Sequence, residues 1–216
     1  LENGIVKNID QRRIYIDLKE NRAFSINCQY AGNVLGLKKL ALRLAIQKAQ
    51  NEGWLCEHMF LMGVKQKNRT SYFTGAFPSA CGKTSTAMLP GQNIVGDDIS
   101  YILSSDGKAY GVNVEQGIFG IIEDVNPVDD PLIYEALTTP REIIFSNVLV
   151  TDSYPYWTGM GKTIPKSGDN YSGKWTEGKI DTITQKPIPP SHKNARYTIR
   201  LQELKNCDPK LHDPHG

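Results

Sequence analysis

The segment that most constrains this chain is residues 77–84, which read Phe-Pro-Ser-Ala-Cys-Gly-Lys-Thr. A strand-like run over residues 71–77 leads into it, and a short helix-like run over residues 84–89 follows and ends before Pro90. A loop in this position holds phosphate, because its backbone N–H groups point at the anion, its lysine meets the outer phosphates and its threonine can ligate a nucleotide-bound Mg²⁺. The segment therefore predicts an α/β fold with a mixed sheet and a P-loop-type nucleotide-binding lobe.

The context of the loop carries this prediction more than its Gly82-Lys83-Thr84 tripeptide does. The strict phosphate-loop pattern places a glycine five residues before the glycine of that tripeptide, and Phe77 stands there instead. The same tripeptide recurs at residues 161–163, but Ile164-Pro165 follows at once and leaves no helix N-terminus for an anion. We interpret the second copy as an ordinary loop.

Length, charge and cysteine usage set the bounds on function. The chain has 216 residues, which allows one or two domains with a substantial core, and a net charge of +2, which indicates neither a nucleic-acid nor a membrane partner. No apolar run is long enough to span a bilayer. The four cysteines lack paired spacing, so we expect reduced thiols in a cytoplasmic protein. The chain begins without methionine, and we expect it to be a piece of a longer protein.

Hydrophobic periodicity predicts one long helix over residues 35–51, ended by Gly53 as a C′ residue, with a turn at residues 30–33 before it. From residue 154 to residue 190 the chain is rich in Gly, Pro, Ser, Lys and Thr, and we expect long loops with little core there. Strands are predicted at residues 14–16, 23–28, 58–64, 71–77, 93–103 (returning through a hairpin turn at Asp106-Gly107) and 142–150.

Two adjacent carboxylates, Asp97 and Asp98, interrupt the apolar strand downstream of the phosphate loop. Phosphoryl transfer needs carboxylates that hold a divalent metal, and this is where such acids belong. Adjacent aspartates also occur in turns, but burying two of them within a strand is costly without cations, so we favour the functional interpretation. His58 and the Lys38-Lys39 pair are weaker candidates, because each taken alone reads as an ordinary strand-end histidine or solvated charge.

Together these residues carry a family resemblance. Residues 77–84, followed by Val95-Gly96-Asp97-Asp98-Ile99, closely resemble the two kinase signatures of the GTP-dependent phosphoenolpyruvate carboxykinases. Residues 30–33 with Lys38-Lys39, and residues 52–59, resemble further segments of that family, and the likeness runs from about residue 23 to the C-terminus. The resemblance implies a carboxykinase-like fold, in which residues 1–53 end an N-terminal substrate-binding domain and residues 54–216 begin an incomplete nucleotide-binding domain that is loop-rich after residue 154.

The resemblance also implies a reaction. The family is a group of carboxy-lyases that decarboxylate oxaloacetate and transfer a phosphoryl group from GTP, giving phosphoenolpyruvate, CO₂ and GDP in gluconeogenesis and anaplerosis. The implied cofactors are Mn²⁺ in the active site and Mg²⁺ with GTP. Implied partners are these small molecules only, with no nucleic acid and no membrane.

Site roles follow residue by residue. The implied Mn²⁺ ligands are a lysine amine, His58 and Asp98, with Asp97 supporting the metal site from beside it. Counting forward from Asn33 puts the lysine at Lys39, and counting back from Arg43 puts it at Lys38; we choose Lys39. The implied catalytic residues are Ser79 and Tyr30 on the substrate side, with Cys81 and Lys83 in the loop. The implied nucleotide-binding residues are Ala80, Cys81, Gly82, Lys83, Thr84 (also a ligand of the nucleotide's metal) and Ser85.

Alternatives from other classes remain open. One is a different P-loop phosphotransferase in which Lys39 and His58 are structural, and another is an inactive nucleotide-binding fragment. Family members have several hundred residues, and the segments that bring their substrate-clamping arginines and guanine-binding aromatic residues are not found here. Whether the isolated chain is active is therefore open, as are its nucleotide specificity, oligomeric state and direction of reaction.

Overall fold

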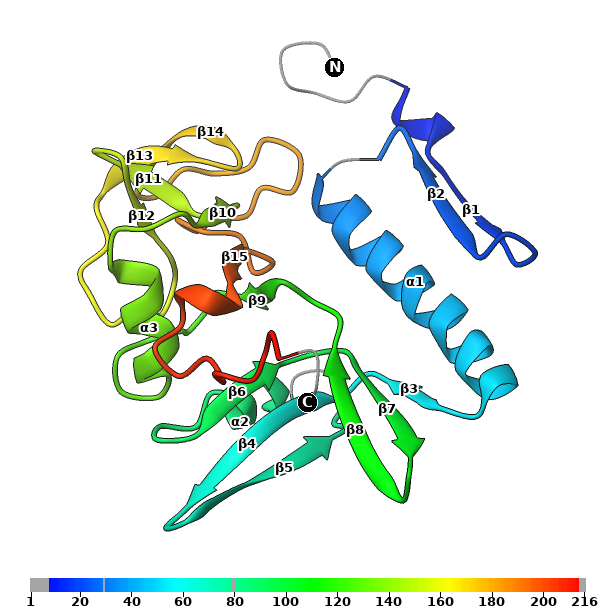
Figure 1. Ribbon diagram of the computed structural model, residues 1–216. Coiled ribbons are helices and arrows are strands. Elements are labelled where there is room, and N and C mark those ends of the chain that lie inside the picture. Colours follow the sequence, from blue (N-terminus) through cyan, green and yellow to red (C-terminus); the bar gives the residue numbers. More distant parts are fainter. Residues whose placement is uncertain (1–7, 29, 79–80, 214–216) are drawn as a thin grey trace.

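The computed structural model describes residues 8–28, 30–78 and 81–213 (Figure 1). Within these residues the strands form five small sheets, and every strand ladder is antiparallel. The fold is thus α/β as predicted, but the expected mixed sheet is replaced by several antiparallel ones. One isolated parallel bridge joins Ile94 to Cys207.

The N-terminal part is a β-hairpin with a long helix beside it (Figure 1). Its elements are the 3₁₀ turn η1 (Ile9–Gln11), strands β1 (Arg13–Asp17) and β2 (Arg22–Ile26), and helix α1 (Tyr30–Glu52). Gly53 has a φ of 78°, which confirms it as the left-handed residue after the helix. The predicted turn at residues 30–33 was wrong, because the helix already begins at Tyr30. The weak helix preference of Gly32 and Asn33, about 1 kcal/mol or less each, is outweighed in so long a helix.

Two three-stranded sheets form the central part, in the orders β5-β4-β6 and β3-β7-β8. Their strands are β3 (Leu55–Glu57), β4 (Phe60–Gln66), β5 (Arg69–Gly75), β6 (Asn93–Gly96), β7 (Ser100–Ser105) and β8 (Lys108–Asn113), with the short helix α2 (Lys83–Ala87) between β5 and β6. The predicted strand over residues 93–103 is therefore two strands in two sheets, and Asp97 and Asp98 lie where the chain crosses between them. The predicted hairpin turn at Asp106-Gly107 is confirmed.

The C-terminal part holds a three-stranded sheet, β10-β15-β9, and a four-stranded sheet, β12-β11-β13-β14. Its elements are β9 (Gly117–Ile121), α3 (Pro131–Thr138), β10 (Ile144–Ser146), β11 (Leu149–Thr151), β12 (Tyr154–Tyr156), β13 (Ser167–Asn170), β14 (Gly173–Thr176), β15 (Arg196–Arg200) and the 3₁₀ turn η2 (Leu201–Glu203). The predicted strand over residues 142–150 is split into β10 and β11, because Asn147 turns the chain with a φ of 60°.

The expectation of little core over residues 154–190 was wrong. Trp157 and Met160 are buried in the main hydrophobic core, and Trp175 forms a smaller cluster with Leu149 and Ile188. Each indole N–H finds a backbone carbonyl, that of Val125 for Trp157 and that of Ile188 for Trp175, both at 2.8 Å. Large aromatic side chains with satisfied polar atoms thus give these short strands a core.

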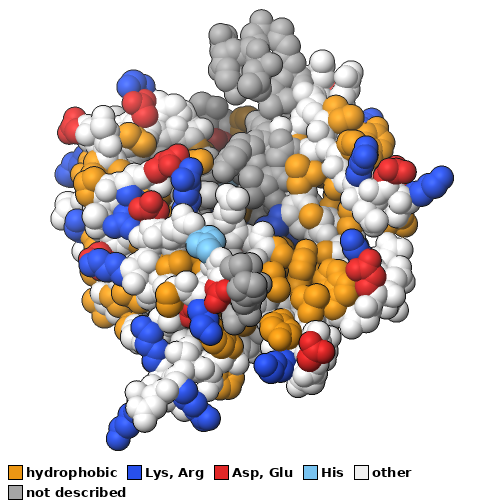
Figure 2. Space-filling view, in the orientation of Figure 1, with side chains coloured by type: hydrophobic (Ala, Val, Ile, Leu, Met, Phe, Trp, Pro, Cys, Tyr) orange, Lys and Arg blue, Asp and Glu red, His pale blue; other side chains and the backbone are white. Residues whose placement is uncertain are grey.

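The surface is uneven in its polarity. In the view of Figure 2, hydrophobic side chains gather on the face between α1 and the β7–β8 hairpin. Exposed hydrophobic residues on β3, β7 and β8 include Leu55, Leu103 and Val112. None of the helices in the described part of the chain is long and apolar enough to cross a membrane.

Candidate active site

The phosphate loop leads directly into α2 and is anchored on the core. Phe77 packs edge-on against Phe60 of β4, with ring centroids 5.5 Å apart. Gly82 has a φ of 82°, a left-handed conformation that suits glycine, and it immediately precedes the helix. Ala87 and Met88 at the far end of α2 are buried. The strand, loop and helix order predicted for this segment is confirmed.

The second Gly-Lys-Thr copy behaves differently. Gly161 lies in a loop with a φ of 76°, and no helix follows it. Lys162 is exposed, and its ammonium lies 5.7 Å from the centroid of the Tyr134 ring. The interpretation of this copy as an ordinary loop is confirmed.

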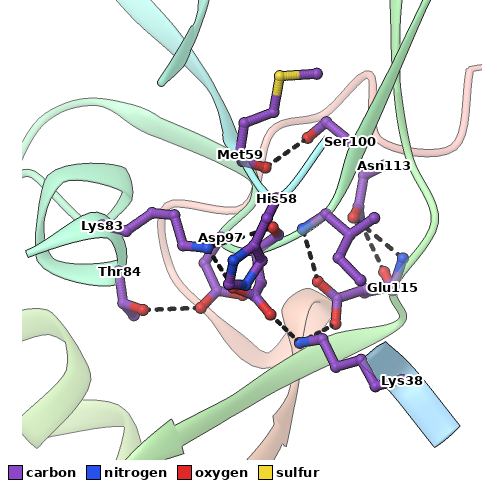
Figure 3. Close-up of polar contacts among 11 residues, drawn as sticks. Lys38, His58, Met59, Lys83, Thr84, Asp97, Ser100, Asn113 and Glu115 are labelled. Carbon is purple, nitrogen blue, oxygen red and sulfur yellow. Dashed lines mark hydrogen bonds and ion pairs between the residues drawn. The ribbon is translucent and has the colours of Figure 1, made fainter. Parts of the chain in front are cut away.

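Lys83 and Thr84, the first residues of α2, reach the two aspartates that follow β6 (Figure 3). The Lys83 ammonium donates to Asp98 Oδ1 at 2.5 Å, and the Thr84 hydroxyl donates to Asp97 Oδ2 at 2.9 Å. The phosphate loop and the acidic pair, which are separate motifs in the sequence, therefore form one site.

Asp98 is the centre of this site. Besides Lys83, its carboxylate pairs with the ammonium of Lys38 from α1 and, at 2.5 Å, with Nε2 of His58 (Figure 3). Burial by itself would raise the pKa of Asp98, but Lys38 and Lys83 outweigh it and lower the pKa to about 2. Asp98 is therefore a firmly ionised carboxylate, held by nitrogen groups from three separate parts of the chain.

His58 owes its position to the connection between β3 and β4. The predicted strand over residues 58–64 begins two residues later, at Phe60, so His58 lies just before it. Glu57 pairs with Ser100 at the start of β7, and the buried Ser100 hydroxyl donates to the Met59 carbonyl at 3.0 Å. These contacts hold the backbone on both sides of His58 next to the residues that follow Asp98.

The structure brings Lys38, and not Lys39, to Asp98. The Lys38 side chain is 19% exposed and pairs with both Asp98 and Glu115, whereas Lys39 is exposed on another face of α1. Successive helix residues point about 100° apart, so only one of the two can reach the site. The geometry thus favours the register counted back from Arg43 over our choice of Lys39 for the lysine beside Asp98.

Asp97 and Asp98 have opposite electrostatic environments. Asp97 is 5% exposed, and burial together with the neighbouring charge of Asp98 raises its pKa, although Lys38, Thr84 and Lys83 counteract this. Adjacent carboxylates whose pKa values are driven apart are typical of functional sites. The pair thus combines a firmly ionised carboxylate with a neighbour whose ionised form is disfavoured by burial.

Glu115, between β8 and β9, also belongs to the site, although no sequence pattern pointed to it. Its carboxylate pairs with Lys38 at 2.6 Å and accepts the Ile99 N–H at 3.1 Å. Burial raises its pKa to about 7 against the opposing effect of Lys38. A single acid outside any motif gives no local signal in the sequence, so only the folded chain reveals this contact.

The structure describes some of the remaining predicted site residues but not others. Ser79, Ala80 and the side chain of Tyr30 are outside the described residues. Cys81 is exposed. The Ser85 hydroxyl donates to Asp130 Oδ1 at 3.2 Å and so faces the start of α3.

The donor set fits a divalent cation. No group of three or more His, Cys, Asp or Glu side chains in the described part of the chain could hold a metal ion by themselves. An amine, an imidazole and a carboxylate nevertheless converge where Lys38 and His58 meet Asp98. Nitrogen and oxygen ligands of this kind can be shared by one divalent cation.

Comparisons with known proteins define the class first. Residues 54–216 match the family model of the phosphoenolpyruvate carboxykinase C-terminal P-loop domain, and residues 5–50 match that of the phosphoenolpyruvate carboxykinase N-terminal domain. The chain belongs to the phosphoenolpyruvate carboxykinase family.

The individual relatives all carry the name phosphoenolpyruvate carboxykinase [GTP]. The chain is 61% identical to the phosphoenolpyruvate carboxykinase [GTP] of Pyrococcus furiosus over 217 aligned residues, which cover 100% of this chain and 35% of that protein. It is 47% identical to the enzyme of the same name from Saccharolobus solfataricus, over 97% of this chain and 33% of the relative. It is 37% identical to the phosphoenolpyruvate carboxykinase [GTP] of Chlamydia pneumoniae, over 91% of this chain and 33% of that protein. The chain therefore spans about a third of the length of these relatives.

Proposed function

We propose that this protein acts as a GTP-dependent phosphoenolpyruvate carboxykinase. The observation that carries the proposal is the convergence of Lys38, His58 and Lys83 on the carboxylate of Asp98. It unites a candidate metal site with the lysine of a phosphate loop, and a decarboxylation coupled to phosphoryl transfer needs both. The names of relatives with up to 61% identity support the same activity.

We assign the Mn²⁺ site to Lys38, His58 and Asp98. When bound, this ion would supply Lewis-acid polarisation of the oxaloacetate carbonyl. Lys38 takes the place of Lys39 in the proposal because Lys38 reaches Asp98. Its neighbours raise the pKa of Lys38 despite its burial, so the amine is protonated in the absence of metal and must lose its proton to become a ligand.

The reaction has two stages, decarboxylation and then phosphoryl transfer. The C–C bond to the leaving carboxylate breaks, CO₂ departs and its electron pair stays as an enolate. The enolate oxygen then attacks the γ-phosphorus of GTP, the bond from that phosphorus to the β–γ bridging oxygen breaks, and GDP leaves. Lys83 binds and orients the γ-phosphoryl group and offsets its charge, which is the main catalytic need of phosphoryl transfer. The Thr84 hydroxyl and the Asp97 carboxylate would help to hold the Mg²⁺ that accompanies the nucleotide.

Further parts of the proposal rest on the family alone. Ser79 and Tyr30 would contact oxaloacetate or phosphoenolpyruvate, and Ala80, Cys81, Gly82 and Ser85 would contact GTP or GDP. We also propose that residues 1–53 belong to the substrate-binding domain and residues 54–216 to the nucleotide-binding domain. We also propose a cytoplasmic location, which agrees with the free thiols of Cys56, Cys81 and Cys207.

The direct test is a turnover assay on the full-length protein. Oxaloacetate, GTP and Mn²⁺ should give phosphoenolpyruvate and GDP in equal amounts, measured by coupled enzymes and by phosphorus NMR. Omission of GTP or of all divalent metal should abolish phosphoenolpyruvate formation. GTP consumption without phosphoenolpyruvate formation would contradict the proposal.

A further inference from the structure

We propose that Glu115 is a positioning residue of the metal site, which holds the amine of Lys38 toward Asp98 and His58. The inference rests on the proposed function, because the role of Glu115 is defined by the cation that Lys38 would bind. Neither the family models nor the names of the relatives assign any role to this residue.

The two oxygens of Glu115 are engaged on different parts of the chain. Oε1 pairs with Lys38 Nζ at 2.6 Å, while Oε2 accepts the backbone N–H of Ile99 at 3.1 Å (Figure 3). Ile99 directly follows Asp98. One carboxylate therefore ties the lysine on α1 to the backbone that carries the central aspartate of the site.

Glu115 is itself fixed in place. The Asn113 side chain donates to the Glu115 carbonyl at 2.6 Å and accepts the Glu115 N–H at 3.1 Å, which closes a rigid local turn. Asn113 in turn packs against Gly96 at the end of β6, where a Cβ added to the glycine would lie 2.5 Å from Asn113 Oδ1. The turn at residues 113–115 is thus seated against the backbone just before Asp97, and the Glu115 side chain is only 15% exposed.

Glu115 anchors the Lys38 side chain, which would otherwise be flexible. A lysine side chain has many rotamers, and fixing it costs up to about 2 kcal/mol of conformational entropy. A lysine amine that binds a cation through its lone pair keeps two N–H groups, and an acceptor for one of them sets the direction of the lone pair. Outer acceptors of this kind orient metal ligands in proteins generally. Glu115 is the carboxylate placed to accept from Lys38 without contacting His58.

The contact also joins the two regions that the family models distinguish. Lys38 lies within residues 5–50 and Glu115 within residues 54–216. A lysine supplied by one region to a metal site in the other needs a fixed point in that second region, and Glu115 provides it.

The experiment measures Mn²⁺ binding to the full-length protein by electron paramagnetic resonance, in which free Mn²⁺ is counted directly. Glu115→Gln should weaken Mn²⁺ affinity by about 10- to 100-fold, the usual effect of losing an outer-shell partner. Glutamine offers one acceptor oxygen, so it cannot serve both Lys38 and Ile99. Glu115→Asp keeps the carboxylate and should recover part of the affinity. The matched control is Glu177→Gln, because Glu177 also pairs with a lysine, Lys166, at 3.5 Å on the exposed surface; its affinity should equal wild type.

A second readout follows the lysine itself. With lysine labelled by ¹⁵N at its amine, pulsed electron paramagnetic resonance should detect coupling of that nitrogen to Mn²⁺ in the wild type, and the coupling should weaken or vanish in Glu115→Gln. A general loss of stability would not remove the coupling from the protein that remains folded. Unfolding by urea gives the folded fraction of each variant, and Glu115→Asp carries the test if the glutamine variant does not fold.

The outcomes separate the two proposals. Wild-type affinity and wild-type ¹⁵N coupling in Glu115→Gln would overturn the role of Glu115 and leave the proposed function intact. Mn²⁺ binding that is unchanged in Asp98→Asn, or that lacks lysine coupling in the wild type, would overturn the proposed metal site and the role of Glu115 with it.

Discussion

Lys83 and Asp98 are fifteen residues apart in the sequence, yet the ammonium of the first donates to the carboxylate of the second across 2.5 Å. The contact joins the start of α2 to the crossing between β6 and β7. It places the lysine expected to meet phosphate beside a carboxylate expected to hold metal. This junction, and the elements that build it, should therefore respond to substitution in specific ways.

Replacing Lys83 with alanine should remove phosphoryl transfer. The charge that orients and stabilises the transferring group is lost, and groups of this kind contribute about 10³- to 10⁵-fold in turnover. The measurement is the rate of phosphoenolpyruvate formation from oxaloacetate and GTP. The second Gly-Lys-Thr copy offers a control, since Lys162→Ala removes an exposed lysine from the same tripeptide. Equal losses in the two variants would show that the loop at residues 82–84 has no special role.

The adjacent lysines of α1 should behave differently. Lys38→Met should lower Mn²⁺ affinity and turnover by at least about 10-fold, because it deletes a nitrogen donor that lies beside Asp98. Lys39→Met changes the neighbouring exposed side chain and should leave both quantities near wild type. Titration with Mn²⁺ measures the first quantity and the coupled assay the second. The reverse pattern would return the metal ligand to Lys39.

The low pKa of Asp98 predicts a pH dependence of stability in the metal-free protein. A carboxyl whose pKa falls from 3.8 to about 2 on folding stabilises the native state above its ordinary pKa, and this contribution disappears as pH falls through 2. This contribution to the free energy of unfolding is up to about 2 kcal/mol. Urea unfolding with a chelator at several pH values between 2 and 5 measures the slope. Asp98→Asn should have a shallower slope in this window, and parallel slopes for the two proteins would contradict the prediction.

Asp208 should be important for stability away from the site. Its side chain is buried and accepts the Asn93 amide at 3.0 Å and the Tyr72 hydroxyl at 3.3 Å, next to the point where Cys207 bridges to β6. Asp208→Ala leaves these donors without their partner, which should cost about 2–3 kcal/mol in the free energy of unfolding. Asp169→Ala removes an exposed carboxylate paired with Lys174 and should change the free energy by less than about 0.5 kcal/mol. Similar losses in both variants would argue against the buried network.

The cysteines should react in a fixed order. Cys81 is exposed in the phosphate loop, whereas Cys56 is 2% exposed and burial raises its pKa to about 11. Thiolate is the reactive form, so a maleimide at neutral pH should modify Cys81 first and Cys56 only after unfolding. GTP with Mg²⁺ should slow the reaction of Cys81 if the loop binds nucleotide. Peptide mass spectrometry identifies the modified residue, and early labelling of Cys56 would contradict the burial of its side chain.

Features with a local signal could be predicted from the sequence. The phosphate loop, the long helix ended by Gly53 and the hairpin at Asp106-Gly107 each depend on residues close together in the chain. The acidic pair was found because carboxylates interrupt an apolar run. The single strand predicted over residues 93–103 was nevertheless wrong, because nothing in that segment indicates that the chain passes from one sheet to another at Asp97.

What could not be predicted depends on contacts between distant segments. Glu115 becomes part of the site only because the β7–β8 hairpin returns the chain to α1. The choice between Lys38 and Lys39 needed the rotation of α1 about its axis, which sequence spacing alone left ambiguous. The region of residues 154–190 looked like loops because its strands are only three or four residues long. The signal missed there was the pair of tryptophans, Trp157 and Trp175, whose size favours burial even in a polar stretch.

The most direct test is a crystal structure of the full-length protein with Mn²⁺, with the ion located by its anomalous scattering. An anomalous peak in coordination contact with Lys38 Nζ, His58 and Asp98, within reach of the Lys83 ammonium, is the predicted result. A peak elsewhere, or bound Mn²⁺ without nitrogen from Lys38, would contradict the proposed site and the chemistry built on it.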